Sequence, residues 1–369
     1  MALNTDDAAV CDGQLWQKFC KRLSEATATL RHPGAPTSDF DQAEGSRYLS
    51  RLIRLGLEIY LESGDPEFPS FYQPSHETAK LGGDNPDNLY LSATISGKHQ
   101  YRLRGNIGSV SYLSIGSKAN RYAIDGTMPS TGELVGEQFC PDKHGNFNII
   151  VSVTKPEDNQ PWLPLAEDSS MLHLRQTFLD RRRETPATIG IERISDGPSV
   201  PPPADPTVLA NRLMAAADFV VHSSALFAGW AETFMQSPNQ LKDWGQDMFI
   251  RAGGDPQIFY VHGYWRLKPG EALVIDTPVP ECEHWNIQIN NWWMESLDYR
   301  YHNIWVNKHS VTLNRDGTAT IVIAKTDPGF GNWLPTEGHD EGFVLLRWVR
   351  ASHHPVPTSK IVKLENRSP

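Results

Sequence analysis

The chain of 369 residues is long for one domain and sufficient for two. Its hydrophobic content of 39% and charged content of 21% are typical of a globular protein. The net charge of −10 argues against a nucleic-acid partner, because phosphate binding needs a basic surface.

Neither a signal peptide nor a membrane anchor is expected. Residues 1–13 contain no basic region followed by an apolar run. No apolar run elsewhere approaches the length of a bilayer span. The sequence therefore predicts a cytoplasmic protein with no membrane partner, and a homo-oligomer is left open.

Residues 1–66 are predicted to be a helical segment. Leu15, Phe19 and Leu23 recur at helical spacing. Ser38 and Asp41 have the spacing of a capping pair in front of a second helix.

The residue pattern changes from helical to strand-like after residue 66. From 67 to 195, Pro, Gly, Asn and Asp separate short alternating runs, which is typical of antiparallel strands. Residues 196–249 predict a Pro-rich linker and then a helix that begins at Asp205-Pro206. Residues 250–352 again show the alternating pattern of β-strands. Residues 353–369 lack a pattern and are expected to be a mobile tail.

The two β regions resemble each other. Tyr90 and Tyr260 are separated by 170 residues, the Trp-Leu-Pro segments at 162 and 333 by 171, and Arg175 and Arg347 by 172. Such drift is expected when insertions fall in surface loops. The fold class is therefore predicted as mainly β, built from two tandem related copies of an antiparallel β-sandwich or jelly roll, with α-helices added at the N-terminus and between the copies.

Two strands of the second copy carry polar faces. In 257–267, Tyr260, His262, Tyr264 and Arg266 share one face. In 282–293, His284, Asn286, Gln288 and Asn290 share one face, opposite Trp285, Ile287 and Ile289. If the strands are adjacent, the polar faces could line a cleft. The strand 89–96 of the first copy has no histidine or arginine, so these groups are expected to be specific to the second copy.

Three stretches carry a family resemblance: YVHGYWRLKPGEALVI (260–275), NNWWMESLDYR (290–300) and DGTATIVIAKTDPGFGNWLPTEGHDEGFVLLRW (316–348). With them the chain resembles long single-chain members of the bacterial domain-of-unknown-function family 1214, which is associated with family 1254. The resemblance implies a β-sandwich or jelly roll with helical additions, and it implies no reaction. The chain departs from long members at 181–183, where it has Arg-Arg-Arg.

No motif predicts a cofactor or metal. There is no H-E-x-x-H, no tight H-x-H, no G-x-S-x-G and no Gly-rich phosphate loop. The histidines at 262, 284 and 302 have no local chelate spacing, so no metal is expected.

Two functional classes remain open. The first is a cofactor-independent hydrolase or lyase that uses acid–base chemistry on a small, partly apolar organic or carbohydrate-like molecule. The second is a non-catalytic carbohydrate- or small-ligand-binding or structural module, which 11 Trp and 11 Tyr would suit. The predicted catalytic residues are His262, His284 and Tyr264, and the predicted substrate-binding residues are Asn286, Asn290, Trp265, Trp292, Arg347 and Asn332.

Overall fold

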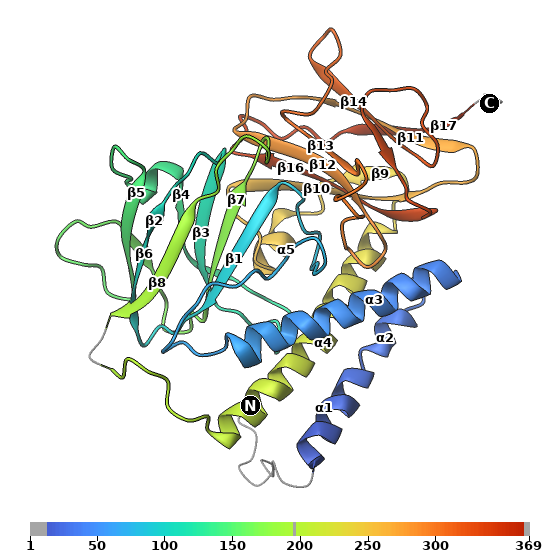
Figure 1. Cartoon of the computed structure of the whole chain (residues 1–369). Coiled ribbons are helices and arrows are strands. Elements are labelled where there is room, and N and C mark those ends of the chain that lie inside the picture. Colours follow the sequence, from blue (N-terminus) through green and yellow to red (C-terminus); the bar gives the residue numbers. More distant parts are fainter. Residues whose placement is uncertain (1–12, 195–196, 365–369) are drawn as a thin grey trace.

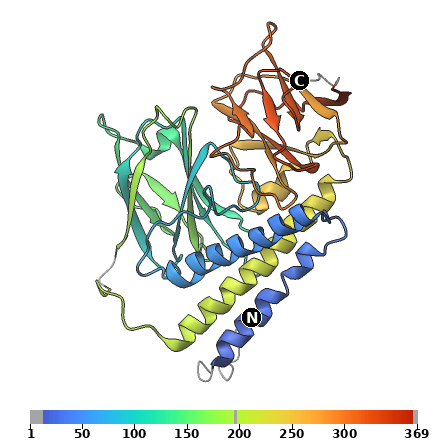
Figure 2. The same ribbon diagram turned by 45° about the vertical axis from the view of Figure 1, so that its right-hand side comes forward.

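The computed structural model describes residues 13–194 and 197–364. Over these ranges the protein is mainly β, as predicted, with seventeen strands, sixteen of which form four four-stranded sheets. Helices run along one side of both β regions (Figures 1 and 2).

From residue 13 on, the N-terminal segment is largely helical, as expected, and the predicted residues 1–12 lie outside the described ranges. Its elements are α1 (Gln14–Ser24), α2 (Thr27–Leu30), α3 (Asp39–Gly56) and the π-helical turn η3 (Leu57–Glu62). The predicted cap is confirmed, because the Ser38 hydroxyl accepts the Asp41 N–H at 3.0 Å.

The first β region contains eight strands. They are β1 (Asn88–Thr94), β2 (Gln100–Asn106), β3 (Tyr112–Lys118), β4 (Ser130–Val135), β5 (Asn146–Ser152), β6 (Trp162–Pro164), β7 (Met171–Thr177) and β8 (Thr188–Ile194), with the short helix η4 (Gly136–Phe139) after β4. The sheets have the orders β1-β7-β3-β4 and β6-β5-β2-β8, and only the β5–β6 pair is parallel.

The long helix α4 (Pro206–Phe234) connects the two β regions. The Asp205 carboxylate caps it by accepting two backbone N–H groups. By length and composition α4 could cross a bilayer, although no such segment is expected from the sequence. Its buried residues, however, pack against α1, α3 and η3, as a core helix does. The cytoplasmic location stays a prediction.

The second β region repeats the strand order of the first. Its elements are β9 (Gln240–Lys242), α5 (Gln246–Arg251), β10 (Ile258–Arg266), β11 (Glu271–Pro278), β12 (His284–Asn290), β13 (Trp305–Asn307), β14 (Thr318–Ala324), β15 (Trp333–Pro335), β16 (Glu341–Val349) and β17 (Thr358–Lys363). The sheets are β10-β16-β12-β13 and β15-β14-β11-β17, so β10–β17 match β1–β8 one for one.

The mobile tail predicted from residue 353 is wrong for part of its length. Thr358–Lys363 form β17, which pairs antiparallel with β11. The backbone ladder to β11 orders this segment, although its side chains are mostly exposed. The last five residues lie outside the described ranges.

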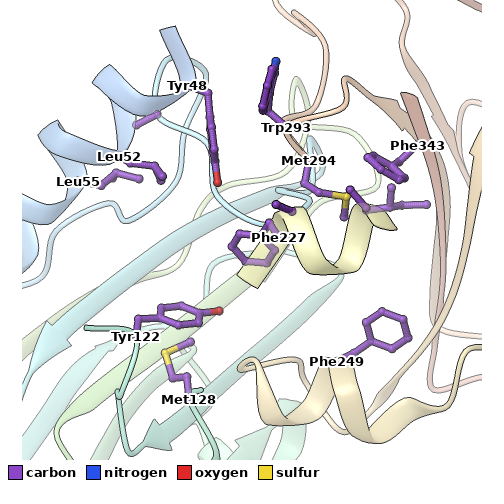
Figure 3. Close-up of a cluster of buried hydrophobic side chains, with 14 of the residues drawn as sticks. Tyr48, Leu52, Leu55, Tyr122, Met128, Phe227, Phe249, Trp293, Met294 and Phe343 are labelled. Carbon is purple, nitrogen blue, oxygen red and sulfur yellow. The ribbon is translucent and has the colours of Figure 1, made fainter. Parts of the chain in front are cut away.

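Each β region has its own apolar core, and a third core joins the helices to both. In the second region, Trp285 and Ile287 of β12 meet Ile321 of β14 between the two sheets. The third core combines Tyr48, Leu52 and Leu55 of α3 with Phe227 of α4 and Phe343 of β16 (Figure 3). The helices therefore hold the two β regions together.

Candidate functional site

A matching pair of turns joins the two halves. In the turn before β1, the Asn85 N–H donates to the Tyr90 hydroxyl at 3.1 Å. In the turn before β10, the Asp255 N–H donates to the Tyr260 hydroxyl at 2.9 Å. The two turns have the same internal hydrogen bonds, and each lies on the sheet of the other half.

Matching arginines anchor these turns. Arg175 on β7 donates from Nη2 to the Gly253 carbonyl at 2.6 Å. Arg347 on β16 donates from Nη2 to the Gly83 carbonyl. The two side chains thus cross the boundary between the halves in opposite directions, in agreement with their matching positions in the sequence.

The polar face of β12 is covered by residues 84–87 of the first half. Four of its side chains are fully buried and bonded: His284 Nε2 lies 3.2 Å from Asp87, Asn286 donates to Asn85 (2.6 Å), Gln288 to the Asp84 carbonyl (2.7 Å) and Asn290 to the Met294 carbonyl (3.1 Å). In addition, β16 separates β10 from β12. The predicted cleft between adjacent polar strands is therefore absent, since protein fills that space.

Four other predicted site residues also make internal contacts. Tyr264 donates its hydroxyl to Glu341, and Trp265 is buried in the core of the second half. Trp292 packs against His32 and Met235, and Asn332 bonds the backbone of Thr312 and Thr320. These contacts hold the fold together and bring none of the four to the cavity described next.

A cavity of about 140 Å³ lies between the two halves and α4. Among the predicted site residues, His262 and Arg347 line it. The first half contributes Tyr90, His173 and Arg175. Figure 3 shows apolar lining side chains from three segments: Tyr122 and Met128, Phe227 of α4, and Phe249 of α5.

His262 is the predicted catalytic residue that reaches this cavity. Its ring stacks on Phe249, with 4.4 Å between centroids, and on Phe234, with 5.3 Å. Its Nδ1 has no hydrogen-bond partner among the described residues. Burial, with a further contribution from the charge of Arg347, holds the pKa of His262 well below 6.5. The imidazole is therefore neutral at pH 7.

His173 is a second histidine of the cavity that sequence reasoning missed. Its Nδ1 lies 2.8 Å from the Ser92 hydroxyl, and its ring stacks on Tyr90. Burial, followed by the charges of Arg175 and Lys118, lowers its pKa well below 6.5. The expectation that imidazole and guanidinium groups are specific to the second half is wrong, because β7 carries both. Residues 171–176 (MLHLRQ) contain both the histidine and the arginine, so the sequence held this information.

The two histidines come from different strands of matching sheets. Ser92 on β1 pairs in register with His173 on β7, and His262 on β10 pairs with Leu345 on β16. Each half therefore supplies one imidazole, but from strands that do not correspond. His173 lies on β7, whereas His262 lies on β10, which is the counterpart of β1.

A second cavity of about 170 Å³ lies between α3 and the segment 291–302. Two ion pairs lie within its lining: Arg51 contacts Glu295 at 2.7 Å, and His302 contacts Glu337 at 3.0 Å. Burial raises the pKa of Glu295. Within residues 13–194 and 197–364, no three His, Cys, Asp or Glu side chains are grouped as metal ligands.

The buried histidines predict a loss of stability in acid. In the folded state both pKa values lie well below 6.5, so below that pH the unfolded chain binds more protons. Each histidine should therefore lower the free energy of unfolding by up to about 1.4 kcal/mol per pH unit as the pH falls from 6.5. The His262→Phe variant keeps a stacked ring and should show a smaller slope between pH 7 and 5 in urea unfolding.

The control for this experiment is the exposed His144. His144→Phe should leave the pH slope unchanged. An equal slope in wild type and His262→Phe would show that His262 does not stay neutral in the folded protein.

Three comparisons place the chain among known proteins. A family model described as "Protein of unknown function (DUF1214)" matches residues 271–353. The crystal structure of an uncharacterized protein from Burkholderia cenocepacia shares 45% identity, with a TM-score of 0.94, over 96% of this chain and 98% of that chain. A Vibrio parahaemolyticus protein gives 11% identity and a TM-score of 0.49, over 93% of this chain and 100% of that chain. No curated protein matches.

Proposed function

This chain belongs to the DUF1214 family of proteins of unknown function, and we propose that it is a cofactor-independent enzyme. It performs acid–base chemistry on a small, partly apolar organic molecule held in the cavity between the two halves. The observation that carries this proposal is a neutral imidazole, His262, which lines a cavity with hydrogen-bond donors and whose Nδ1 has no partner among the described residues.

His262 acts as the base in this proposal. Its neutral ring takes a proton from the bound molecule, becomes imidazolium and later returns the proton, so no other reactant is needed. Tyr260 and Arg175 stabilise the negative charge that develops on an oxygen of the substrate. Burial raises the pKa of Tyr260 to about 12, so its hydroxyl stays protonated and can donate.

The size and lining of the cavity limit the substrate. A cavity of about 150 Å³ in another protein binds benzene, and the cavity here has about 140 Å³. Phe227, Trp230 and Phe249 supply apolar walls. A molecule with one ring or a short chain fits, whereas a carbohydrate would bury many hydroxyls against apolar carbon at high cost.

A non-catalytic ligand-binding module is the second candidate. The observation that favours it is the surroundings of His262, where aromatic rings rather than a carboxylate hold the imidazole. An imidazole without such a partner is a weaker base, because no anion stabilises its protonated form.

Filling the cavity tests the location of the site. Leu81 lines it and is partly buried. In Leu81→Trp, the larger side chain should abolish both turnover and ligand-induced stabilisation across a panel of small acids, esters and lactones. Leu81→Met conserves volume and should keep both. Full activity in a folded Leu81→Trp protein would place the site elsewhere.

We also propose that each half is a two-sheet β-sandwich and that the halves arose by duplication. The one-for-one match of strand order, the matching turns and the reciprocal arginine contacts support this proposal. In each half, apolar side chains from both sheets share one core.

A further inference from the structure

The two cavity arginines differ in how far the protein satisfies their terminal nitrogens. Arg347 uses Nη2 for the Gly83 carbonyl and Nη1 for Gln288 Oε1, at 2.6 Å. Arg175 uses Nη2 for the Gly253 carbonyl, but its Nη1 has no partner within residues 13–194 and 197–364. Both terminal nitrogens of Arg347 therefore have an acceptor in the protein, whereas only one terminal nitrogen of Arg175 does.

The difference arises at one position where the halves have diverged. Arg347 pairs in register with Asn286, and Gln288 follows two residues later on β12. Arg175 pairs with Ser114, and the residue two positions later on β3 is Gly116. Glycine has no side chain that could accept the hydrogen bond, so Nη1 of Arg175 lacks the acceptor that Gln288 gives to Nη1 of Arg347.

The free donor is buried and charged. Arg175 is 7% exposed. Burial opposes its charge, but nearby groups, with Asp255 first, raise its pKa above the ordinary value. The Asp255 carboxylate already accepts from Tyr112 and Ser114. Glu133, the other nearby carboxylate, pairs with Lys118 through Oε1, and its Oε2 has no donor among the described residues. A buried donor without an acceptor destabilises the protein, and a ligand with a suitable acceptor removes that cost.

We infer that the ligand is an organic monocarboxylate. Its carboxylate binds Arg175, since a guanidinium matches a carboxylate in charge and geometry. Its apolar body, about one ring or a six-carbon chain in size, packs on Phe227 and Phe249. A second carboxylate is disfavoured because both terminal nitrogens of Arg347 already have protein acceptors, and a buried unpaired charge is costly. The inference rests on the proposed function only for the location of the site.

Calorimetry with hexanoate, adipate and hexanamide tests the inference. These probes share a six-carbon chain and carry one, two or no carboxylates. The wild-type protein should bind hexanoate at least about 10-fold more tightly than either of the other two. Arg175→Gln should weaken hexanoate at least about 10-fold and leave hexanamide unchanged. Undetectable hexanoate binding to the wild type, or equal binding of hexanoate and hexanamide, would overturn the inference.

Gln288 supplies the matched pair of variants. Gln288→Leu removes the acceptor of Arg347 at similar volume, so adipate binding should strengthen at least about 10-fold. Gln288→Glu keeps Arg347 occupied and should give no gain. If Gln288→Leu fails to fold, the Arg175→Gln result alone decides the question. A folded Gln288→Leu protein that still rejects adipate would contradict the role assigned to Gln288.

These measurements record binding, so they are independent of turnover. Hexanoate binding that depends on Arg175, without turnover of any acid, would uphold the ligand class and remove the enzyme proposal. Turnover of neutral molecules with no preference for carboxylates would uphold the enzyme proposal and remove the proposed ligand class.

Discussion

Replacing Asp87 by alanine is expected to lower the free energy of unfolding by about 3 kcal/mol or more. Asp87 is 3% exposed and lies in the turn of the first half. Its Oδ1 accepts from Trp305 Nε1 and Asn307 Nδ2, each at 2.8 Å, and its Oδ2 lies 3.2 Å from His284 Nε2. Alanine would leave Trp305 Nε1 and His284 Nε2 without this acceptor and Asn307 Nδ2 with only the Leu179 carbonyl. Each buried donor that loses its acceptor costs about 1–3 kcal/mol.

Asp316 provides the control. It also accepts two hydrogen bonds, both from Thr318, but it is exposed and within one half. Asp316→Ala should therefore cost less than about 1 kcal/mol. Urea unfolding followed by tryptophan fluorescence and circular dichroism compares the two. Equal midpoints for both variants would mean that the Asp87 network does not hold the halves together.

Alternation along strands predicted faces correctly, but it could not predict what covers them. Trp285, Ile287 and Ile289 occupy the core of the second half, as their spacing indicates. His284 and Asn286 lie on the opposite face, as expected. That face is buried because a turn from the other half, about 200 residues earlier, supplies matching polar groups. Period-two spacing carries no information about such a long-range partner.

The cavity, too, could be predicted only in part, because it depends on contacts between distant strands. The repeat spacing correctly matched Arg175 with Arg347, and the structure brings both to one cavity. The two arginines differ in their hydrogen bonds because of Gly116 and Gln288. Gly116 lies on β3 beside the strand of Arg175, and Gln288 lies on β12 beside the strand of Arg347. Only the register between strands relates these residues to the arginines. His173 lies on β7, opposite Ser92, so the strand 89–96 by itself gives no indication of an imidazole in the first half.

Local signals were more reliable than long-range ones. Ser38 and Asp205 cap their helices as predicted, because a cap depends only on the next three residues. The segment Thr358–Lys363 shows the opposite case: its order comes from pairing with β11, almost 90 residues earlier, and its own composition gives no such indication.

Changing His262 to glutamine is expected to reduce turnover by about 100-fold or more while a small carboxylate still binds. Glutamine cannot take up the proton, whereas the carboxylate contact of Arg175 is unaffected. Since the pKa of His262 lies well below 6.5, its basic form persists into acid, and the acid limb of kcat/KM should fall below pH 6.5. Arg347→Gln removes a nearby positive charge, so the limb should move to higher pH.

His284→Gln separates chemistry from folding. His284 is fully buried beside Asp87 and away from the cavity, so this change should lower the melting temperature with little loss of turnover per folded molecule. His262→Gln should show the reverse pattern. Turnover, the melting temperature and hexanoate affinity should be measured on the same preparations. Full turnover in His262→Gln would exclude this imidazole as the base and direct attention to His173, which is the other neutral imidazole of the cavity. Loss of turnover in proportion to the folded fraction would show that the ring contributes only its packing against Phe234 and Phe249.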